Sequence, residues 1–350
     1  MKTFDYVRPT SIPEAVAAAS QPGAAYLAAG TNLLDLMKGD ITRPSRLVDV
    51  NRLPGLDGIE HLPDGGVRVG ALVRNADLAY DAVFAKRFPA VAEALLSGAS
   101  AQLRNAATVG GNLLQRTRCP YFYDTASACN KREPGTGCDA LGGDNRLHAV
   151  LGWSESCIAT NPSDFAVPLV AFDAVVEIEG AGGRREVPLE AFHRLPGHTP
   201  QRDTVLEPGE LIVALRLPAE AAGFAGHARY LKVRERTSYA FAVVSAAAGL
   251  TLDGGTIRGA RIALGGVALK PWRARAAEAL LAGAKPDAAS FQKAAEAALA
   301  EAKPSGDNAF KTELARRIVV RALTLAAAGT PDRMPALPAS PFATGVRLDG

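Results

Sequence analysis

Long apolar runs and several common binding signatures are missing from this 350-residue sequence. No stretch reaches the roughly 18 apolar residues of a membrane-spanning helix, so no membrane span is expected. The net charge is only +3 and no basic stripe is present, which argues against a nucleic-acid-binding protein. Residues 1–15 are interrupted by Asp5, Arg8 and two prolines and do not form a signal peptide, which on its own predicts a cytoplasmic protein.

Cysteine is absent from most of the chain, because all four cysteines lie between positions 119 and 157. Residues used only for packing would scatter, so this grouping indicates a site that needs four sulfur ligands: a zinc ion, two disulfides or an iron–sulfur cluster. The spacing lacks the paired C-x2-C motifs typical of zinc, whereas a cubane cluster tolerates irregular spacing because its irons face well-separated thiolates. The candidate ligands are Cys119, Cys129, Cys138 and Cys157.

Basic side chains surround the first two cysteines. They either form a solvated loop, or their positive charge raises the reduction potential of a cluster or docks an acidic partner. These residues are Arg116, Arg118, Lys131 and Arg132. No Ser/His/Asp or paired-carboxylate arrangement emerges, so no catalytic residue is predicted. The histidines that could have suggested a ligand set show no ligand spacing and are interpreted as structural or surface residues: His148, His193 and His198.

Two glycine turns indicate a bound ligand. The first, at residues 29–32, follows a short apolar strand and precedes a helical pattern, an arrangement that exposes unpaired N–H groups to phosphate. The second, at residues 108–112, contains Gly110 and Gly111, which would allow close approach of the backbone to a ligand. Neither GxxxxGK nor GxGxxG occurs, so the pair predicts an extended phosphorylated ligand held outside the P-loop and Rossmann schemes.

The pattern of elements predicts an α+β protein with a domain boundary in the small, turn-prone segment 218–226. Before it, short strands alternate with helices, one of which is expected from Asn75 or Asp77 to about Ser97. After it come three strands, at 229–236, 241–252 and 257–264, with a hairpin turn at 253–255. Three alanine-rich helices follow, at about 272–283, 287–302 and 307–328.

Four motifs resemble the FAD-binding medium subunit of the xanthine dehydrogenase family, in the family's order and over nearly the full chain. They are Leu27–Leu34, Ala101–Leu113, Asn161–Asp164 and Lys232–Ser238. Most relatives pass almost directly from the second to the third motif, whereas here a segment at about 114–160 intervenes and contains every cysteine. Its sequence RTRCPYFYDTASACNKREPGTGC resembles the flavoprotein subunit of bacterial periplasmic aldehyde oxidoreductases.

The resemblance implies a specific architecture. Residues 1–222 would form a two-part FAD-binding domain of the PCMH, or vanillyl-alcohol-oxidase-like, type, with subdomains at about 1–55 and 56–222. The insert would bind a [4Fe–4S] cluster through the four cysteines. Residues 225–330 would form a small C-terminal α+β domain with a three-stranded antiparallel sheet and helices, and residues 331–350 an extended arm.

The resemblance also implies the FAD contacts. Backbone donors of the first turn would hold the pyrophosphate, although Ala29 stands where many relatives have glycine. Asp164 would accept hydrogen bonds at the adenosine ribose, Ile212 would offer backbone contacts, and Lys232 would lie near the flavin ring. The full predicted set is Tyr26, Leu27, Ala28, Ala29, Gly30, Thr31, Asn32, Leu33, Leu34, Thr108, Gly110, Gly111, Asn112, Asp164, Ile212 and Lys232.

As a function, the resemblance implies an oxidoreductase that works as a heterotrimer. A large molybdenum-cofactor subunit would oxidise an aldehyde to a carboxylate, and a small subunit with two [2Fe–2S] clusters would relay electrons to this chain, whose FAD would pass them to an external acceptor. Two alternatives are a flavoprotein subunit of a 4-hydroxybenzoyl-CoA reductase-like enzyme and a zinc-stapled binding module without redox function. The flavoproteins that the insert resembles are periplasmic, so the resemblance implies that the chain is exported folded with a signal-bearing partner, with a cytoplasmic location as the alternative.

Overall fold

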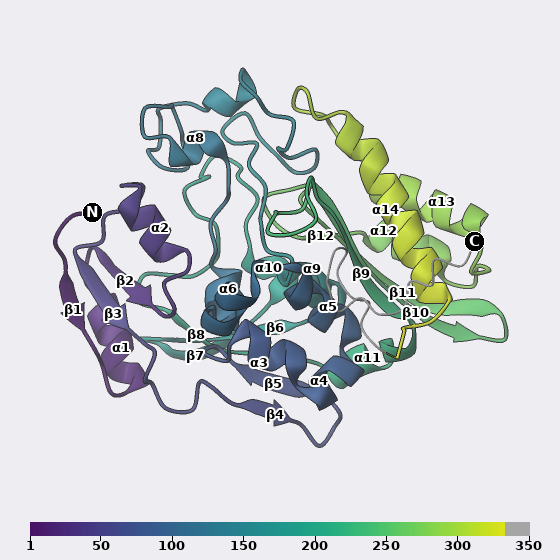
Figure 1. Cartoon of the computed structure of the whole chain (residues 1–350), viewed down its shortest axis with the longest axis horizontal. Helices are drawn as coiled ribbons and strands as arrows, with labels where there is room; N and C mark the ends of the chain where they lie inside the picture. The colour runs from purple at the N-terminus through teal and green to yellow at the C-terminus, as the bar shows by residue number, and fades with distance from the viewer. Residues whose placement is uncertain (333–350) are drawn as a thin grey trace.

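The computed structural model describes residues 1–332 and contains three separate sheets, arranged from left to right in Figure 1 in chain order of their first strands. All but the first two residues of the predicted arm at 331–350 lie outside the described residues. No helix in the described part of the chain is both long enough and apolar enough to cross a membrane.

The N-terminal unit is a small parallel sheet with strand order β1-β3-β2. Helix α1 begins where Ser11 caps it by accepting from the Glu14 N–H at 3.4 Å, with Pro13 in its first turn. Apolar residues of α1 and β3 pack with Leu211 and Val213 of the later strand β8 in one buried cluster. The elements are β1 (Asp5–Val7), α1 (Ile12–Ala19), β2 (Ala24–Leu27), α2 (Leu33–Lys38) and β3 (Arg46–Asp49).

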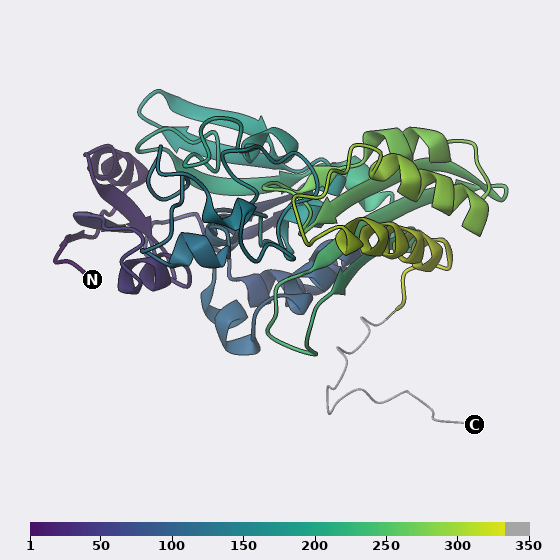
Figure 2. The same cartoon turned by 90° about the horizontal axis from the view of Figure 1, so that it is seen from above.

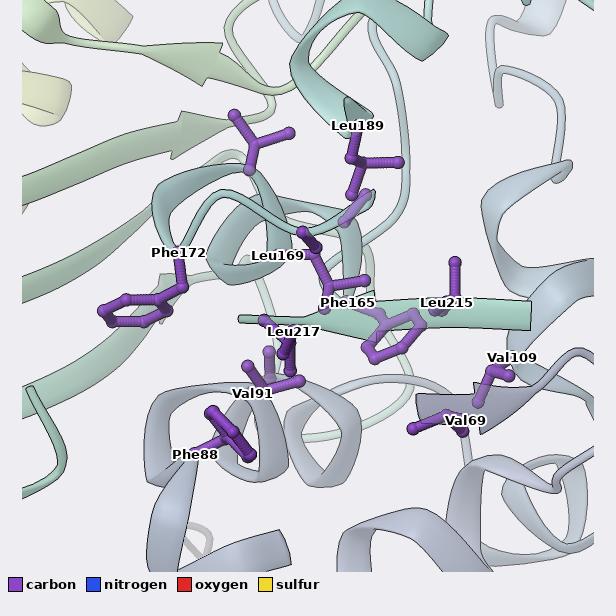
Figure 3. Packing of buried hydrophobic residues seen from close by; sticks show 14 of the residues in the cluster. Val69, Phe88, Val91, Val109, Phe165, Leu169, Phe172, Leu189, Leu215 and Leu217 are labelled. Atoms are coloured by element: carbon purple, nitrogen blue, oxygen red, sulfur yellow. The ribbon is translucent and has the colours of Figure 1, made fainter. Parts of the chain in front are cut away.

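The central unit is an antiparallel sheet of five strands in the order β4-β5-β8-β6-β7. Figure 3 shows Val91 of α5 and Leu169 of α9 packing with Leu217 of β8, the strand in the middle of this sheet. The strands are β4 (Ile59–His61), β5 (Val67–Gly70), β6 (Val175–Gly180), β7 (Gly183–Pro188) and β8 (Leu211–Leu217). The helices are α3 (Asn75–Tyr80), α4 (Ala82–Arg87), α5 (Pro89–Ser97), α6 (Ala101–Ala106), α7 (Val109–Leu113), α9 (Ala166–Ala171), α10 (Leu189–Phe192) and α11 (Ala219–Ala222).

The single helix expected from residue 75 to about 97 is wrong, because the chain divides there into α3, α4 and α5. Asp81 ends α3 and caps α4 by accepting from the Phe84 N–H at 2.7 Å. Pro89, which lacks an N–H, begins α5.

The C-terminal unit is an antiparallel sheet with helices α12, α13 and α14 on one face, as Figure 2 shows. Its three long strands agree with the sequence prediction, and a two-residue strand, β12, adds a fourth at the edge because it pairs with β11. The elements are β9 (Ala228–Val233), β10 (Val244–Asp253), β11 (Thr256–Gly265), β12 (Trp272–Arg273), α12 (Arg275–Leu281), α13 (Ala288–Ala298) and α14 (Phe310–Ala327).

The cysteine-bearing insert consists mostly of irregular backbone above the central unit, with only α8 (Pro120–Tyr123) as an α-helix, seen at the top of Figure 1. An internal ion-pair cluster fastens it to the segment before β8. Lys131, whose side chain is 1% exposed, bonds Asp203, and Arg116 Nε donates to the other oxygen of the same carboxylate at 2.8 Å. Burial alone would raise the pKa of Asp203, but the positive charges of Lys131 and Arg116 lower it below its ordinary value.

Candidate functional site

A cavity of about 720 Å³ lies where the three units and the insert meet. Its volume falls within the range of about 300–1,000 Å³ that is typical of small-molecule sites. The wall brings together segments far apart in the sequence: the first glycine turn, the second glycine turn, the Asn-Pro-Ser-Asp segment and strand β9. The predicted residues that line it are Thr31, Asn32, Gly111, Asn112, Asp164 and Lys232.

The first glycine turn has unused backbone hydrogen-bond donors, and two of its residues, Thr31 and Asn32, line this cavity. Within residues 1–332, no backbone or side-chain group accepts from the N–H groups of residues 29–32. Gly30 has a φ of +73°, a conformation that L side chains rarely adopt, which directs the chain from β2 into α2. The side chain of Asn32 adds a further donor: its Oδ1 accepts from the Arg116 N–H at 2.9 Å, whereas its Nδ2 is buried without a partner among the described residues. These donors fit the oxygens of a pyrophosphate.

The second glycine turn is closed on itself and packed against strand β5. Thr108 Oγ1 accepts from the Gly111 N–H at 3.3 Å and caps α7, while the Gly110 N–H donates to Ala71 O at 2.9 Å. A Cβ on Gly110 would lie 2.9 Å from the Ala71 Cβ and 3.0 Å from its carbonyl oxygen. The glycine at 110 is therefore required by close packing of the protein, and only Gly111 and Asn112 of this turn reach the cavity wall.

Asn112 joins the second turn to the Asn-Pro-Ser-Asp segment. Its Oδ1 accepts from Ser163 Oγ at 2.8 Å and from Gln115 Nε2 at 2.8 Å. Ser163 Oγ in turn accepts from the Ala166 N–H at 3.1 Å, at the start of α9. Two motifs separated in the sequence by the whole insert are thus held together by one hydroxyl group.

A buried polar cluster stands at the end of this segment. Asp164 accepts from Lys232 Nζ at 2.7 Å and from the Tyr230 hydroxyl at 2.6 Å, and both partners come from β9. Burial, followed by the charge of Asp164, raises the pKa of Tyr230 far above its ordinary value, so this hydroxyl remains a donor. Asp164 and Lys232 are thus paired directly with each other, although the resemblance implied separate roles for them at the ribose and the flavin ring.

The other predicted residues support the site from behind. Ile212 lies buried within β8, opposite Ile178, and Tyr26 donates its hydroxyl to Gly209 O at 2.7 Å. Thr108 acts as the helix cap described above. The predicted residues that do not appear in the cavity wall are Tyr26, Leu27, Ala28, Ala29, Gly30, Leu33, Leu34, Thr108, Gly110 and Ile212.

The sequence-based reasoning missed His148, Tyr230 and Phe241. His148 and Phe241 line the cavity, and Tyr230 lies behind it as the partner of Asp164. Each is an isolated side chain without a motif of its own. Only the alternation of β9, which directs Tyr230 and Lys232 to the same face, could have linked Tyr230 to the site.

All four cysteines of the chain are free thiols in one neighbourhood. Cys119 precedes α8 and lines the cavity, Cys129 and Cys138 face each other across an isolated antiparallel bridge, and Cys157 is buried next to Cys119. The disulfide alternative therefore does not match the structure.

The surroundings of Cys119 and Cys157 favour the neutral thiol over the negatively charged thiolate. Burial first, with smaller contributions from the neighbouring cysteines, raises the pKa of Cys119 to about 12 and that of Cys157 to about 11. No three His, Cys, Asp or Glu side chains of residues 1–332 converge as they would on a single metal ion.

The basic residues of the insert do not form the solvated loop that was one of the two interpretations. Lys131 is buried, and Arg132 Nη1 donates to Tyr121 O and Phe122 O at 2.8 and 2.9 Å. Arg118 Nη1 donates to the Tyr123 hydroxyl at 2.9 Å, and its guanidinium group lies over the Phe241 ring. The hydrogen bonds of these basic side chains stabilise the insert around the cysteines.

Comparison with known proteins agrees with this geometry. Residues 2–220 match the family model described as the FAD binding domain in molybdopterin dehydrogenase, and residues 229–326 match the CO dehydrogenase flavoprotein C-terminal domain. The chain is 51% identical to the aldehyde oxidoreductase FAD-binding subunit PaoB of Escherichia coli, over 94% of this chain and 99% of that one. It is 31% identical to the carbon monoxide dehydrogenase medium chain of Hydrogenophaga pseudoflava, over 92% and 96%.

Solved structures lead to the same family. A carbon monoxide dehydrogenase from Hydrogenophaga pseudoflava superposes with a TM-score of 0.73 at 32% identity, covering 93% of this chain and 98% of that one. Quinoline 2-oxidoreductase from Pseudomonas putida gives a TM-score of 0.71 at 27% identity, covering 94% and 99%. This chain therefore belongs to the FAD-binding medium-chain subunits of the molybdenum hydroxylase family.

Proposed function

We propose that this chain is the FAD- and [4Fe–4S]-binding electron-transfer subunit of a molybdenum-dependent aldehyde oxidoreductase. The aldehyde assignment is supported by the 51% identity to a subunit of that name, which extends over nearly the whole of both chains. The observation that carries the cluster assignment is the group of four free thiols, one of which, Cys119, also lines the cofactor cavity.

The residues of this chain would bind and orient the FAD. The unpaired N–H groups of residues 29–32 and the free Nδ2 of Asn32 would hold the pyrophosphate. The ion pair of Asp164 and Lys232 would present both a hydrogen-bond acceptor and a positive charge to one part of the cofactor. When bound, FAD supplies two-electron redox chemistry between a [2Fe–2S] subunit and an external acceptor, and the cluster supplies one-electron exchange.

The cluster would be held by Cys119, Cys129, Cys138 and Cys157. Phe122, which is 1% exposed, packs in the same apolar group as Cys129 and excludes water from this side of the site. Burial matters because solvent access is one of the properties that determine a cluster's reduction potential.

We propose a heterotrimer in which the large subunit carries the molybdenum cofactor and the small subunit two [2Fe–2S] clusters. Aldehyde oxidation would occur on the large subunit, since no catalytic acid, base or nucleophile is assigned to this chain. We also propose that the complex is exported to the periplasm already folded, with a signal-bearing partner, because its cofactors must be inserted before export. Cell fractionation of the intact complex tests the location, and a complex found only in the cytoplasm would contradict it.

The cluster assignment is tested by anaerobic purification of the whole complex, followed by assays for iron, acid-labile sulfide, zinc and FAD. Cys129→Ser and Cys157→Ser should each lose the iron and sulfide assigned to this subunit, while the iron of the small subunit remains. Ala126→Ser introduces the same hydroxymethyl side chain at an exposed position of the insert and is the matched control. Zinc in place of iron, or an iron content that neither cysteine variant changes, would contradict the assignment.

The reaction is tested separately with the intact complex. Addition of an aromatic aldehyde under anaerobic conditions should bleach the flavin absorption. A flavin that stays oxidised with aldehydes while the complex remains fully loaded would rule out the aldehyde oxidoreductase.

A further inference from the structure

His148 makes the closest polar contact to a cysteine sulfur from outside the cysteine set. Its Nε2 lies 3.2 Å from Cys119 Sγ, and both residues line the wall of the cofactor cavity. The residue is 5% exposed, so water does not compete strongly for the ring nitrogen. The contact between His148 and Cys119 therefore lies at the boundary between the cysteine site and the cofactor cavity.

The ring of His148 is suited to donate this hydrogen bond. A neutral imidazole carries its proton on either ring nitrogen, and the nitrogen that faces the sulfur is Nε2. Nδ1 is buried without a hydrogen-bond partner in the described part of the chain. A cysteine that ligates iron is a thiolate and can only accept, so the proton belongs on Nε2, which faces the sulfur.

The backbone of His148 is held both by the insert and by the C-terminal unit. Its N–H donates to Asn145 O at 2.9 Å, and its carbonyl oxygen accepts from Lys311 Nζ at 2.8 Å and Asn308 Nδ2 at 3.3 Å. Asn308 and Lys311 are both fully buried at the start of α14. Lys311 also donates to Leu147 O and Gly266 O, at 2.8 and 2.6 Å. This buried network holds the imidazole ring in one position against the sulfur.

We propose that His148 donates a hydrogen bond from Nε2 to the thiolate of Cys119 and thereby raises the reduction potential of the cluster where it adjoins the flavin cavity. This inference rests on the proposed function, since it requires a cluster on the four cysteines. The physical reason is that a donor facing a ligating sulfur stabilises the more negative, reduced cluster more than the oxidised one. His148 is thus a tuning residue that acts through Cys119, and it is neither a ligand nor a catalytic group.

The test compares two variants in the complete anaerobic complex. His148→Phe removes the donor but keeps a planar ring, and should shift the cluster midpoint measured by redox-titrated EPR to a more negative value. His148→Gln retains an N–H donor near the position of Nε2 and should bring the midpoint back toward the unsubstituted value. His198→Phe, at an exposed position outside the cavity wall, is the matched control and should leave the midpoint unchanged.

Metal analysis separates failure of this inference from failure of the proposed function. If the unsubstituted chain carries no iron and sulfide, the proposed function is wrong and the inference is overturned with it. If the cluster is present but the midpoints of His148→Phe and the unsubstituted complex agree, only the inference is overturned. Equal shifts in the Phe and Gln variants, or loss of iron from both, would assign His148 to packing or ligation and would also overturn it.

Discussion

The two glycine turns look alike in the sequence, yet the structure uses them in opposite ways. In the first turn, the N–H groups of residues 29–32 have no acceptor within residues 1–332, so they remain available to a ligand. In the second turn, the N–H groups of residues 109–112 are all bonded within the protein, to Val73, Ala71 or Thr108. The first turn leaves its backbone donors unpaired among the described residues, whereas the second turn uses its donors to pack α7 against the central sheet.

This difference shows that the two turns require glycine for separate physical reasons. At Gly30 the backbone itself needs a positive φ. At Gly110 the φ is ordinary for any residue, and the space for a side chain is already occupied by Ala71. Substitutions in the second turn should therefore affect stability first, while those in the first turn should affect FAD affinity first.

The largest effect is expected from Gly110→Val. A branched side chain would meet Ala71 at distances that van der Waals contacts do not allow, so we expect a loss of about 3 kcal/mol in the free energy of unfolding, measured by thermal or denaturant unfolding. Gly58→Val is the control, because a Cβ there meets nothing within 4 Å. Unchanged stability of Gly110→Val would contradict the view of this turn as a packed joint.

Asn32→Asp should weaken FAD binding by about 10- to 100-fold without a comparable loss of stability. The carboxylate can still accept from the Arg116 N–H, but an oxygen replaces the free Nδ2 donor and repels a phosphate. Titration of the FAD-free complex with FAD measures the affinity. Asn105→Asp makes the same change in charge at an exposed position of α6 and should bind FAD as the unsubstituted chain does.

Thr108→Val should cost about 1 kcal/mol of stability, because the cap of α7 loses its side-chain acceptor while the shape of the residue is kept. FAD affinity measured well below the melting temperature should change little. The same substitution at the exposed Thr125, in the insert, provides the reference for unfolding measurements. A variant that melts normally but loses FAD would mean that Thr108 serves the ligand directly.

Removal of FAD is expected to have the smallest effect, a difference in amide hydrogen exchange between the two turns. Amide hydrogen exchange at residues 29–32 should become roughly fivefold faster in the FAD-free protein, since each N–H loses an acceptor worth about 1 kcal/mol. Exchange at residues 109–112 should stay nearly constant, because those acceptors belong to the protein. Equal acceleration in both turns would contradict the distinction drawn between them.

Much of the fold could be predicted from local patterns. The alternation at 211–217 and the glycine pair at 254–255 define β8 and the β10–β11 hairpin directly. The single helix expected from residue 75 to about 97 rested on Asn75 or Asp77 as its N-cap. The break at Pro89 is a signal that the sequence itself carries, since proline lacks an N–H, whereas the cap by Asp81 shows only in the structure.

The site was only partly predictable. Motif positions such as Asn32, Asn112, Asp164 and Lys232 reach the cavity as expected. The direct contact between Asp164 and Lys232 was not foreseen, since the two residues are far apart in the sequence and meet only through the docking of β9 on the Asn-Pro-Ser-Asp segment. His148 carries no sequence signal at all, because a single histidine becomes significant only through its neighbours.

By itself, the sequence determined the family, the α+β pattern of the elements and the grouping of the four cysteines, because these depend on residue type and spacing along the chain. Only the tertiary structure decided which turn keeps its donors free, which charges meet, and which imidazole faces a thiol. Those outcomes depend on which hydrogen bonds the folded protein satisfies internally, and that is known only when distant segments are brought into contact.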